Sequence, residues 1–279
     1  MRPLFILICF FLAPLFLLAQ PVLTDVAQLA GIQHKAIMGN FEMPAQGGAA
    51  WFDYNNDGWY DLYLTGGLGA DALYKNNGNG TFSDKTIEAG ITAMQGVVTN
   101  GVTTGDVNND GWNDIIVTTF LPAVNHLLIN NGNGTFTDRT TWAGQFDDAN
   151  SFSAAFADLD QDGWLDLYVC NWSRNMEVTV DGPNVNVDSQ RNFYYNNNGD
   201  GTFTEKAAIL GIDDTLGCAL GVLFTDYDGD NDLDIYVAND FGYFNGNSTN
   251  QLFRNDFPGV ALTEISQAVN ADIGMNGMG

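Results

Sequence analysis

Side-chain oxygens recur at a fixed spacing in four nine-residue segments, which we number acidic loops 1 to 4. In each loop Asp or Asn occupies positions 1, 3, 5 and 9, and position 7 adds a backbone carbonyl. A tightly wound loop with this spacing directs alternate residues toward one centre. Positions 1, 3, 5, 7 and 9 are Asp53, Asn55, Asp57, Trp59 and Asp61 in loop 1; Asp106, Asn108, Asp110, Trp112 and Asp114 in loop 2; Asp158, Asp160, Asp162, Trp164 and Asp166 in loop 3; and Asp226, Asp228, Asp230, Asp232 and Asp234 in loop 4.

This donor set favours a hard cation, because every ligand is an oxygen and the loops contain no Cys or His. Calcium accepts about six to eight flexibly placed oxygens, whereas magnesium requires a stricter octahedron and keeps its water. Without a cation the carboxylates of one loop would repel each other. We therefore predict about four bound Ca²⁺ ions, one per loop. Four loops in matching register count against the alternative that these are solvated Asp-Gly turns.

The flanking positions distinguish these loops from EF-hands. A sharp turn is needed at position 6, which is Gly in three loops and Asn in the fourth. An EF-hand requires a glutamate at position 12 and flanking helices. Position 12 is instead apolar and follows a short strand-like run: Leu64, Val117, Val169 and Val237.

Two further motifs repeat with the loops. Asn-Gly-Asn-Gly-Thr-Phe or a close variant begins at Asn77, Asn131 and Asn198, and marks tight hairpin turns. A segment that starts with Thr/Ser-Asp and ends with Ala-Gly-Ile precedes the first two loops, Thr-Asp…Ala-Gly precedes the third, and a looser Thr-Glu…Gly-Ile copy precedes the fourth. The region 20–279 therefore divides into repeat units of about 24–82, 83–136, 137–203 and 204–262, with a partial unit at 263–279.

Each unit contains four short apolar, aromatic or β-branched runs bounded by Gly and Asn, which indicates four strands. Four-stranded units repeated along a chain are typical of β-propeller blades, so we predict an all-β propeller with four blades. The acidic loop joins the first two strands and the Asn-Gly turn joins the last two. Both are therefore expected at the same edge of the propeller.

The acidic loops, each followed by a strand such as Leu167-Tyr-Val169, resemble the FG-GAP/VCBS repeats. The Asn-Gly turns and Ala-Gly-Ile segments are similar to the bacterial branch related to cartilage acidic protein, whose members often carry an ASPIC/UnbV segment. The resemblance implies calcium in the loop between the first two strands of each blade, and a larger propeller of the seven-bladed integrin-α type. The ASPIC/UnbV segment is absent, so we expect a C-terminally truncated fragment that forms an open arc of four blades. A closed four-bladed ring is the alternative.

Residues 1–19 have the features of a secretory signal peptide, with Arg2 before an apolar run. We expect a secreted or cell-surface protein of a bacterial envelope, with no membrane span after signal cleavage. The net charge of −25 excludes nucleic acid as a partner. The remaining cysteines, Cys170 and Cys218, pair or stay buried as free thiols; the sequence leaves both open.

No residue pattern indicates a catalytic site, and His34 and His126 stand alone. We predict a binding or adhesion module for a protein or glycan. The ligand is expected on the face opposite the acidic loops, where two long connections, 171–192 and 239–251, link second and third strands. The alternative is the propeller domain of a carbohydrate-active enzyme such as a polysaccharide lyase, with Arg174 and Arg191 as the only bases on that face.

Overall fold

The computed structural model describes residues 23–38, 47–120, 122–141, 149–177, 186–240, 249–258 and 262–272. Residues 1–19, the predicted signal peptide, lie outside this set. Within the described residues, no helix has the length and apolar character needed to cross a membrane.

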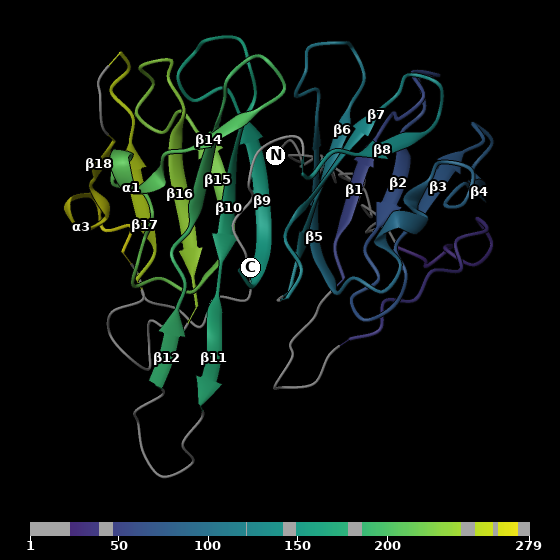
Figure 1. Ribbon diagram of the computed structural model, residues 1–279, viewed down its shortest axis with the longest axis horizontal. Helices are drawn as coiled ribbons and strands as arrows, with labels where there is room; N and C mark the ends of the chain where they lie inside the picture. The colour runs from purple at the N-terminus through teal and green to yellow at the C-terminus, as the bar shows by residue number, and fades with distance from the viewer. Residues whose placement is uncertain are drawn as a thin grey trace, which may run out of the picture.

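The described residues form four antiparallel four-stranded sheets, which lie side by side as blades (Figure 1). This confirms the predicted all-β fold with four blades. Blade 1 contains β1 (Ala49–Phe52), β2 (Asp61–Leu64), β3 (Ala72–Asn76) and β4 (Phe82–Asp84). Blade 2 contains β5 (Thr99–Gly105), β6 (Asp114–Thr119), β7 (His126–Asn130) and β8 (Phe136–Asp138). Blade 3 contains β9 (Ser151–Ala157), β10 (Asp166–Asn171), β13 (Phe193–Asn197) and β14 (Phe203–Glu205). Blade 4 contains β15 (Ala219–Thr225), β16 (Asp234–Asn239), β17 (Gln251–Arg254) and β18 (Thr263–Glu264).

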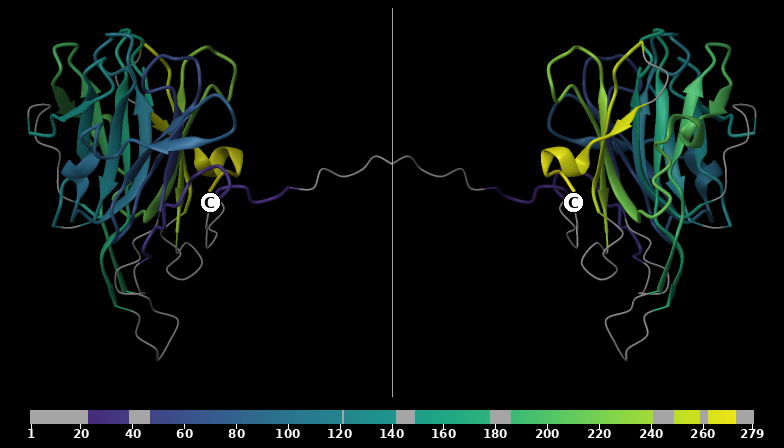
Figure 2. Two further views of the ribbon diagram at one scale, coloured as in Figure 1. Left: turned by 90° about the vertical axis from the view of Figure 1, so that its right-hand side faces the viewer. Right: turned by 90° about the vertical axis from the view of Figure 1, so that its left-hand side faces the viewer.

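The extra length of the third repeat is a two-stranded hairpin, β11 (Ser173–Glu177) and β12 (Asn186–Ser189). It interrupts the connection between the second and third strands of blade 3. The hairpin extends from the edge opposite the acidic loops (Figures 1 and 2). Three short helices follow fourth strands: the 3₁₀ helix η1 (Ile91–Met94), α1 (Ala207–Leu210) and α3 (Ser266–Val269). Periodicity does not predict helices as short as these.

Three layers of the hydrophobic core are each shared by two consecutive blades, and a smaller fourth cluster, Leu62, Ala72 and Tyr74, packs against Ile32 on blade 1. In β6, Ile115 and Val117 pack toward blade 1, whereas Ile116 packs toward blade 3. Alternate side chains of one strand thus enter different layers. All six residues of β6 are buried. A strand buried on both faces has a continuous apolar run, whereas a strand with one solvent-exposed face alternates apolar and polar residues.

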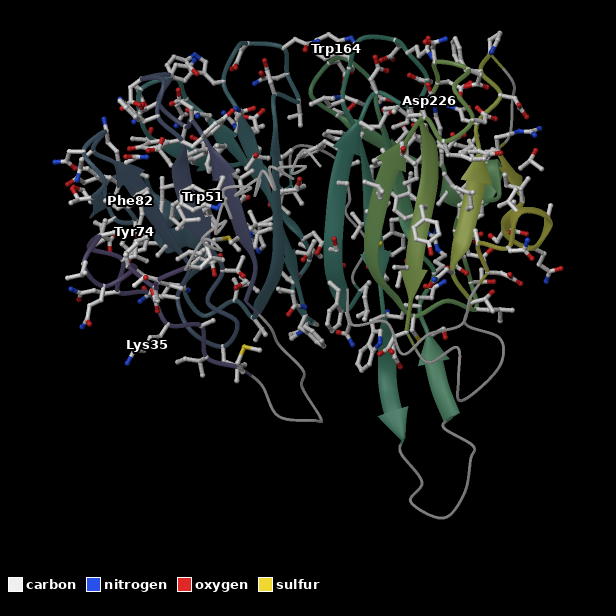
Figure 3. All side chains as sticks on the ribbon, turned by 180° about the vertical axis from the view of Figure 1, so that it is seen from behind. Lys35, Trp51, Tyr74, Phe82, Trp164 and Asp226 are labelled. Atoms are coloured by element: carbon white, nitrogen blue, oxygen red, sulfur yellow. The ribbon has the colours of Figure 1, made fainter. Side chains whose placement is uncertain are left out.

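Contacts between blades follow the chain order. The first strands meet in the series β1–β5, β5–β9 and β9–β15. Among the described residues, no contact of similar extent joins β15 back to β1, so the blades form an open arc. Apolar side chains are exposed on both end blades, with Trp51 at 57% and Leu223 at 58%. Trp51 lies edge-on against Phe82 on the outer face of blade 1 (Figure 3).

The segment 23–38 covers part of that outer face. In its turn at 27–31, the Ala30 carbonyl accepts a hydrogen bond from Phe82 N at 2.7 Å. The Ala89 carbonyl accepts the equivalent bond from Phe136 N of blade 2 at 2.8 Å. The first Ala-Gly-Ile motif therefore contacts blade 1 in the way the second one contacts blade 2.

Candidate metal loops and interblade clefts

The four acidic loops lie between the first and second strands of their blades, at one edge of the arc. Trp164 of loop 3 and Asp226 of loop 4 mark this edge (Figure 3). The Asn-Gly turns between third and fourth strands lie at the same edge, as predicted. The indoles lie against the turns, since a Cβ added to Gly132 would lie 2.9 Å from Trp112 Nε1.

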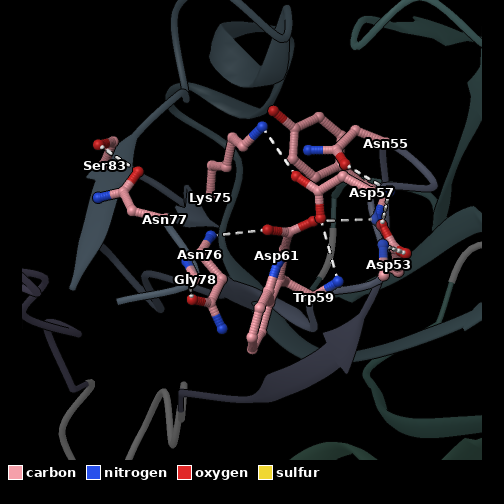
Figure 4. A network of polar contacts seen from close by, with 12 residues as sticks. Asp53, Asn55, Asp57, Trp59, Asp61, Lys75, Asn76, Asn77, Gly78 and Ser83 are labelled. Carbon is pink, nitrogen blue, oxygen red and sulfur yellow. Dashed lines mark hydrogen bonds and ion pairs between the residues drawn. The ribbon is translucent and has the colours of Figure 1, made fainter. Parts of the chain in front are cut away.

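Each loop is wound by its own carboxylates. In loop 1 the Asp53 carboxylate accepts hydrogen bonds from Asp57 N at 3.1 Å and Gly58 N at 2.7 Å, and the Asp57 carboxylate accepts one from Trp59 N at 3.0 Å (Figure 4). The same three bonds recur in the other loops. Position 6 has positive φ throughout, including 75° at Asn231, which confirms the predicted sharp turn.

Position 9 anchors each loop to the sheet, because Asp61, Asp114, Asp166 and Asp234 are all fully buried. Asp114 accepts hydrogen bonds from Val107 N at 3.1 Å and from Asn130 N at 2.8 Å. Burial raises the pKa of Asp61 to about 6 and that of Asp114 to about 7, and it also raises the pKa of Asp166. These carboxyl groups are thus held at the loop centre against a desolvation cost.

Two loops bring three carboxylates together within 4.8 Å: Asp158, Asp160 and Asp166 in loop 3, and Asp226, Asp228 and Asp234 in loop 4. Loops 1 and 2 have the amides Asn55 and Asn108 at position 3, so they contribute one carboxylate fewer. The arrangement fits a cation in two further respects. Asp160 Oδ1 and Asp232 Oδ1 are buried and lack a hydrogen-bond partner. Burial raises the pKa of Asp232, and the neighbouring Asp230 carboxylate raises it further.

Side-chain amides at position 4 tie neighbouring loops together. Asn56 Nδ2 donates to the Gly111 carbonyl at 3.0 Å, and Asn109 Nδ2 donates to the Gly163 carbonyl at 2.9 Å. Gln161 Nε2 reaches the Asn231 carbonyl at 3.2 Å. Loops 1 to 3 are each thereby connected to position 6 of the next loop, a contact that the sequence did not predict.

A buried asparagine at the end of the third strand joins consecutive blades. Asn130 Nδ2 donates to the Tyr54 carbonyl of blade 1 at 2.8 Å and to the Asn113 carbonyl of its own blade at 3.2 Å. Asn197 and Asn255 make the equivalent pairs of bonds in blades 3 and 4. We call these residues the staple asparagines. The Asn that precedes each turn motif is the sequence signal that could have identified them.

The tryptophans at position 7 pack against the Asn-Gly turns of their own blades. Added Cβ atoms at Gly78, Gly132 and Gly199 would lie 2.8 to 2.9 Å from the indoles of Trp59, Trp112 and Trp164. Trp59 remains 51% exposed, whereas Trp112 and Trp164 are half-buried between blades. In loop 4, Asp232 replaces the tryptophan.

Trp112 and Trp164 each line a cleft between two blades. Cleft A, of about 480 Å³, lies between blades 1 and 2, and cleft B, of about 490 Å³, lies between blades 2 and 3. Five lining positions of one cleft have counterparts in the other. Asn55, Lys75, Lys85, Trp112 and Gly132 in cleft A match Asn108, Ile129, Arg139, Trp164 and Gly199 in cleft B.

Comparison with known proteins agrees with this repeat geometry. A model described as "FG-GAP-like repeat" matches residues 53–117, 106–169 and 184–237, more than half of the chain. The chain belongs to the FG-GAP-like repeat family. No curated protein matches. Among solved structures, an Agrocybe aegerita lectin that recognises non-reducing terminal N-acetylglucosamine matches at 21% identity and a TM-score of 0.40, over 76% of this chain and 49% of the lectin. The V. cholerae biofilm matrix protein Bap1 matches at 14% identity and a TM-score of 0.35, over 81% of this chain and 41% of Bap1.

Other predicted features of this FG-GAP-like repeat protein have structural roles or lie outside the described residues. Arg191 forms an ion pair with Glu205 at 3.1 Å and lies over the Phe193 ring. Within the long connections, residues 178–185 and 241–248 are outside the described set. His126 contacts the Asp138 carboxylate at 2.9 Å, and His34 contacts the Thr65 carbonyl at 3.0 Å. Cys170 and Cys218 are buried free thiols.

Proposed function

We propose that this chain is a secreted, calcium-binding propeller module that recognises saccharides in clefts A and B. The observation that carries the proposal is the correspondence of the two clefts. Each presents an indole from one blade, and a basic side chain and an amide from the preceding blade. A protein or glycan ligand on the face of 171–192 and 239–251 is the other binding mode that the sequence predicts.

The chemistry of the clefts suits a sugar. An indole provides a flat apolar surface with a polar edge, and the surrounding Asn, Lys and Arg side chains offer hydrogen bonds to hydroxyl groups. Volumes near 500 Å³ lie within the usual range for small-ligand sites. Repeated clefts on one rigid arc would also let several weak contacts to a polysaccharide add up.

Calcium is the cation that the acidic loops suit best. Their ligands are carboxylate, amide and backbone oxygens in a flexible loop, which is calcium chemistry more than magnesium chemistry. Positions 1, 3, 5, 7 and 9 would hold one ion in each loop. The positive charge of that ion would compensate the buried position-9 carboxylate. We expect weak affinities, on the order of 10⁻⁴ to 10⁻³ M, as in other extracellular modules.

A glycan array read in calcium, followed by calorimetry with the best ligand, tests the saccharide proposal. Trp112→Ala and Trp164→Ala should each weaken binding about tenfold, as expected for an aromatic anchor. Trp59→Ala is the matched control, since Trp59 packs on the equivalent glycine but lines neither cleft. Equal losses in all three variants, or binding that survives the double variant Trp112→Ala/Trp164→Ala, would refute the cleft assignment.

A further inference from the structure

The residue just before the staple asparagine differs in every blade, and it lies beside the acidic loop. In blade 1 the equivalent position, before Asn76, is Lys75. The other three are Ile129, Asn196 and Arg254. All four positions have the same strand register. The same backbone position therefore places a side chain of different charge or polarity beside each loop.

Lys75 places its ammonium group against one carboxylate of loop 1. Its Nζ lies 2.9 Å from Asp57 Oδ2, the position-5 carboxylate, as Figure 4 shows. The side chain of Lys75 is 34% exposed and that of Asp57 is 30% exposed, so the pair is partly shielded from water. Loop 1 therefore contains its own positive charge.

The other loops do not reproduce this contact. Ile129 has no charge to offer loop 2. In loop 3, Asn196 Nδ2 donates to Asp160 Oδ2 at 3.1 Å and to Asp166 Oδ1 at 3.0 Å, and its own Oδ1 accepts from Lys206 Nζ. In blade 4 the guanidinium of Arg254 pairs with Asp256, outside loop 4, at 2.8 Å.

We infer that Lys75 is a tethered counter-ion that makes loop 1 the weakest calcium site and the least dependent on calcium for its folded shape. This rests on the proposed calcium binding of the loops. The ammonium group already offsets one carboxylate, so an arriving cation gains less from loop 1 and is repelled by Lys75. Repulsion between an ammonium and a divalent ion a few ångströms apart in a water-like medium weakens binding about tenfold.

Two substitutions test the inference, one that removes the charge beside loop 1 and one that adds a charge beside loop 2. Lys75→Met keeps the apolar stem and removes the charge, whereas Ile129→Lys adds a charge at the matching position of loop 2. Lys85→Met is the control, because Lys85 also lines cleft A but pairs with Glu88 and not with a loop carboxylate. Calcium binding is measured by calorimetry, and thermal unfolding is measured in chelator and in saturating calcium.

In the unmodified protein one site should be about tenfold weaker than the others, and Asp53→Ala should remove that site alone. Lys75→Met should bring the weak site into the range of the rest and lower the melting temperature in chelator more than in calcium. Ile129→Lys should weaken a second site about tenfold. Unchanged isotherms in both Lys75→Met and Ile129→Lys would overturn the role of Lys75 while leaving calcium binding intact. Absence of calcium binding in the unmodified protein would overturn both.

Discussion

Removal of calcium should make the stability of this protein fall as the pH rises from about 4 to 7. In the metal-free fold, burial raises the pKa of Asp114 to about 7, from the ordinary value of 3.8 for an aspartate. The folded state then holds a proton that the unfolded state has released. Stability contributed by such a group is greatest below the unfolded pKa and is lost as the pH rises through the folded pKa.

The magnitude follows from the shift. One pKa unit corresponds to about 1.4 kcal/mol, so the shift of Asp114 amounts to an upper limit of about 4 kcal/mol. Asp61, whose pKa is raised to about 6, adds an upper limit of about 3 kcal/mol over a lower pH window. Both carboxylates are fully buried, so solvent screening does not remove the effect.

Calcium should abolish most of this pH dependence, because a bound cation favours the ionised carboxylates and lowers their pKa values. Urea unfolding at several pH values, in chelator and in saturating calcium, measures both curves. Asp214, whose pKa burial raises to about 6, lies outside the acidic loops and should contribute equally in both conditions. The difference between the curves therefore isolates the loops.

Asp138 does not disturb the comparison. Although burial alone would raise its pKa, hydrogen bonds from His126 and Thr140 lower the pKa to about 2. Its contribution is present above the unfolded pKa and is lost only below about pH 4.

Asp114→Asn should flatten part of the chelator curve. A chelator curve that is flat between about pH 4 and 7, or that has the same slope in calcium, would refute the assignment of these buried carboxylates to a cation site.

Three sets of substitutions test other parts of the fold. Gly132→Ala should cost about 2 to 4 kcal/mol, because an added Cβ meets the Trp112 indole and φ is +68°. Gly134→Ala, with φ +84° and only Tyr54 Cε2 at 4.0 Å from the added Cβ, should cost about 1 to 2 kcal/mol. Equal losses would show that the indole contact is unimportant. Asn130→Ala should cost about 1 to 3 kcal/mol by leaving a buried carbonyl of the preceding blade unpaired, and Asn76→Ala, which has no such partner, should cost less. Asp162→Ala should lower the melting temperature in calcium but little in chelator, and a similar drop in both would show a purely structural role.

The sequence predicted the blades well because the relevant signals are local. Asn-Gly turns, position-6 glycines and short apolar runs fix hairpins within one repeat, and the loops begin at residues 53, 106, 158 and 226 in the same register. Burial of both faces of β6 also follows from its continuous apolar run. The placement of loops and turns at one edge required only the strand order.

Contacts between repeats were not predictable in the same way. Asn130 reads as an ordinary turn residue, yet it reaches the Tyr54 carbonyl 76 residues earlier in the chain. Lys75 and Ile129 occupy matching positions, but only the blade geometry shows that this position faces an acidic loop. The clefts likewise combine residues from two blades, so their linings become visible only when consecutive repeats are packed together.

Calcium titration of chelator-treated protein by calorimetry tests the central claim most directly. The geometry of the acidic loops predicts about four sites, with affinities on the order of 10⁻⁴ to 10⁻³ M, the weakest of them removed by Asp53→Ala, and little competition from magnesium at equal concentration. A titration that shows no saturable binding, a single site, or equal affinity for magnesium would contradict the assignment of the loops as calcium sites.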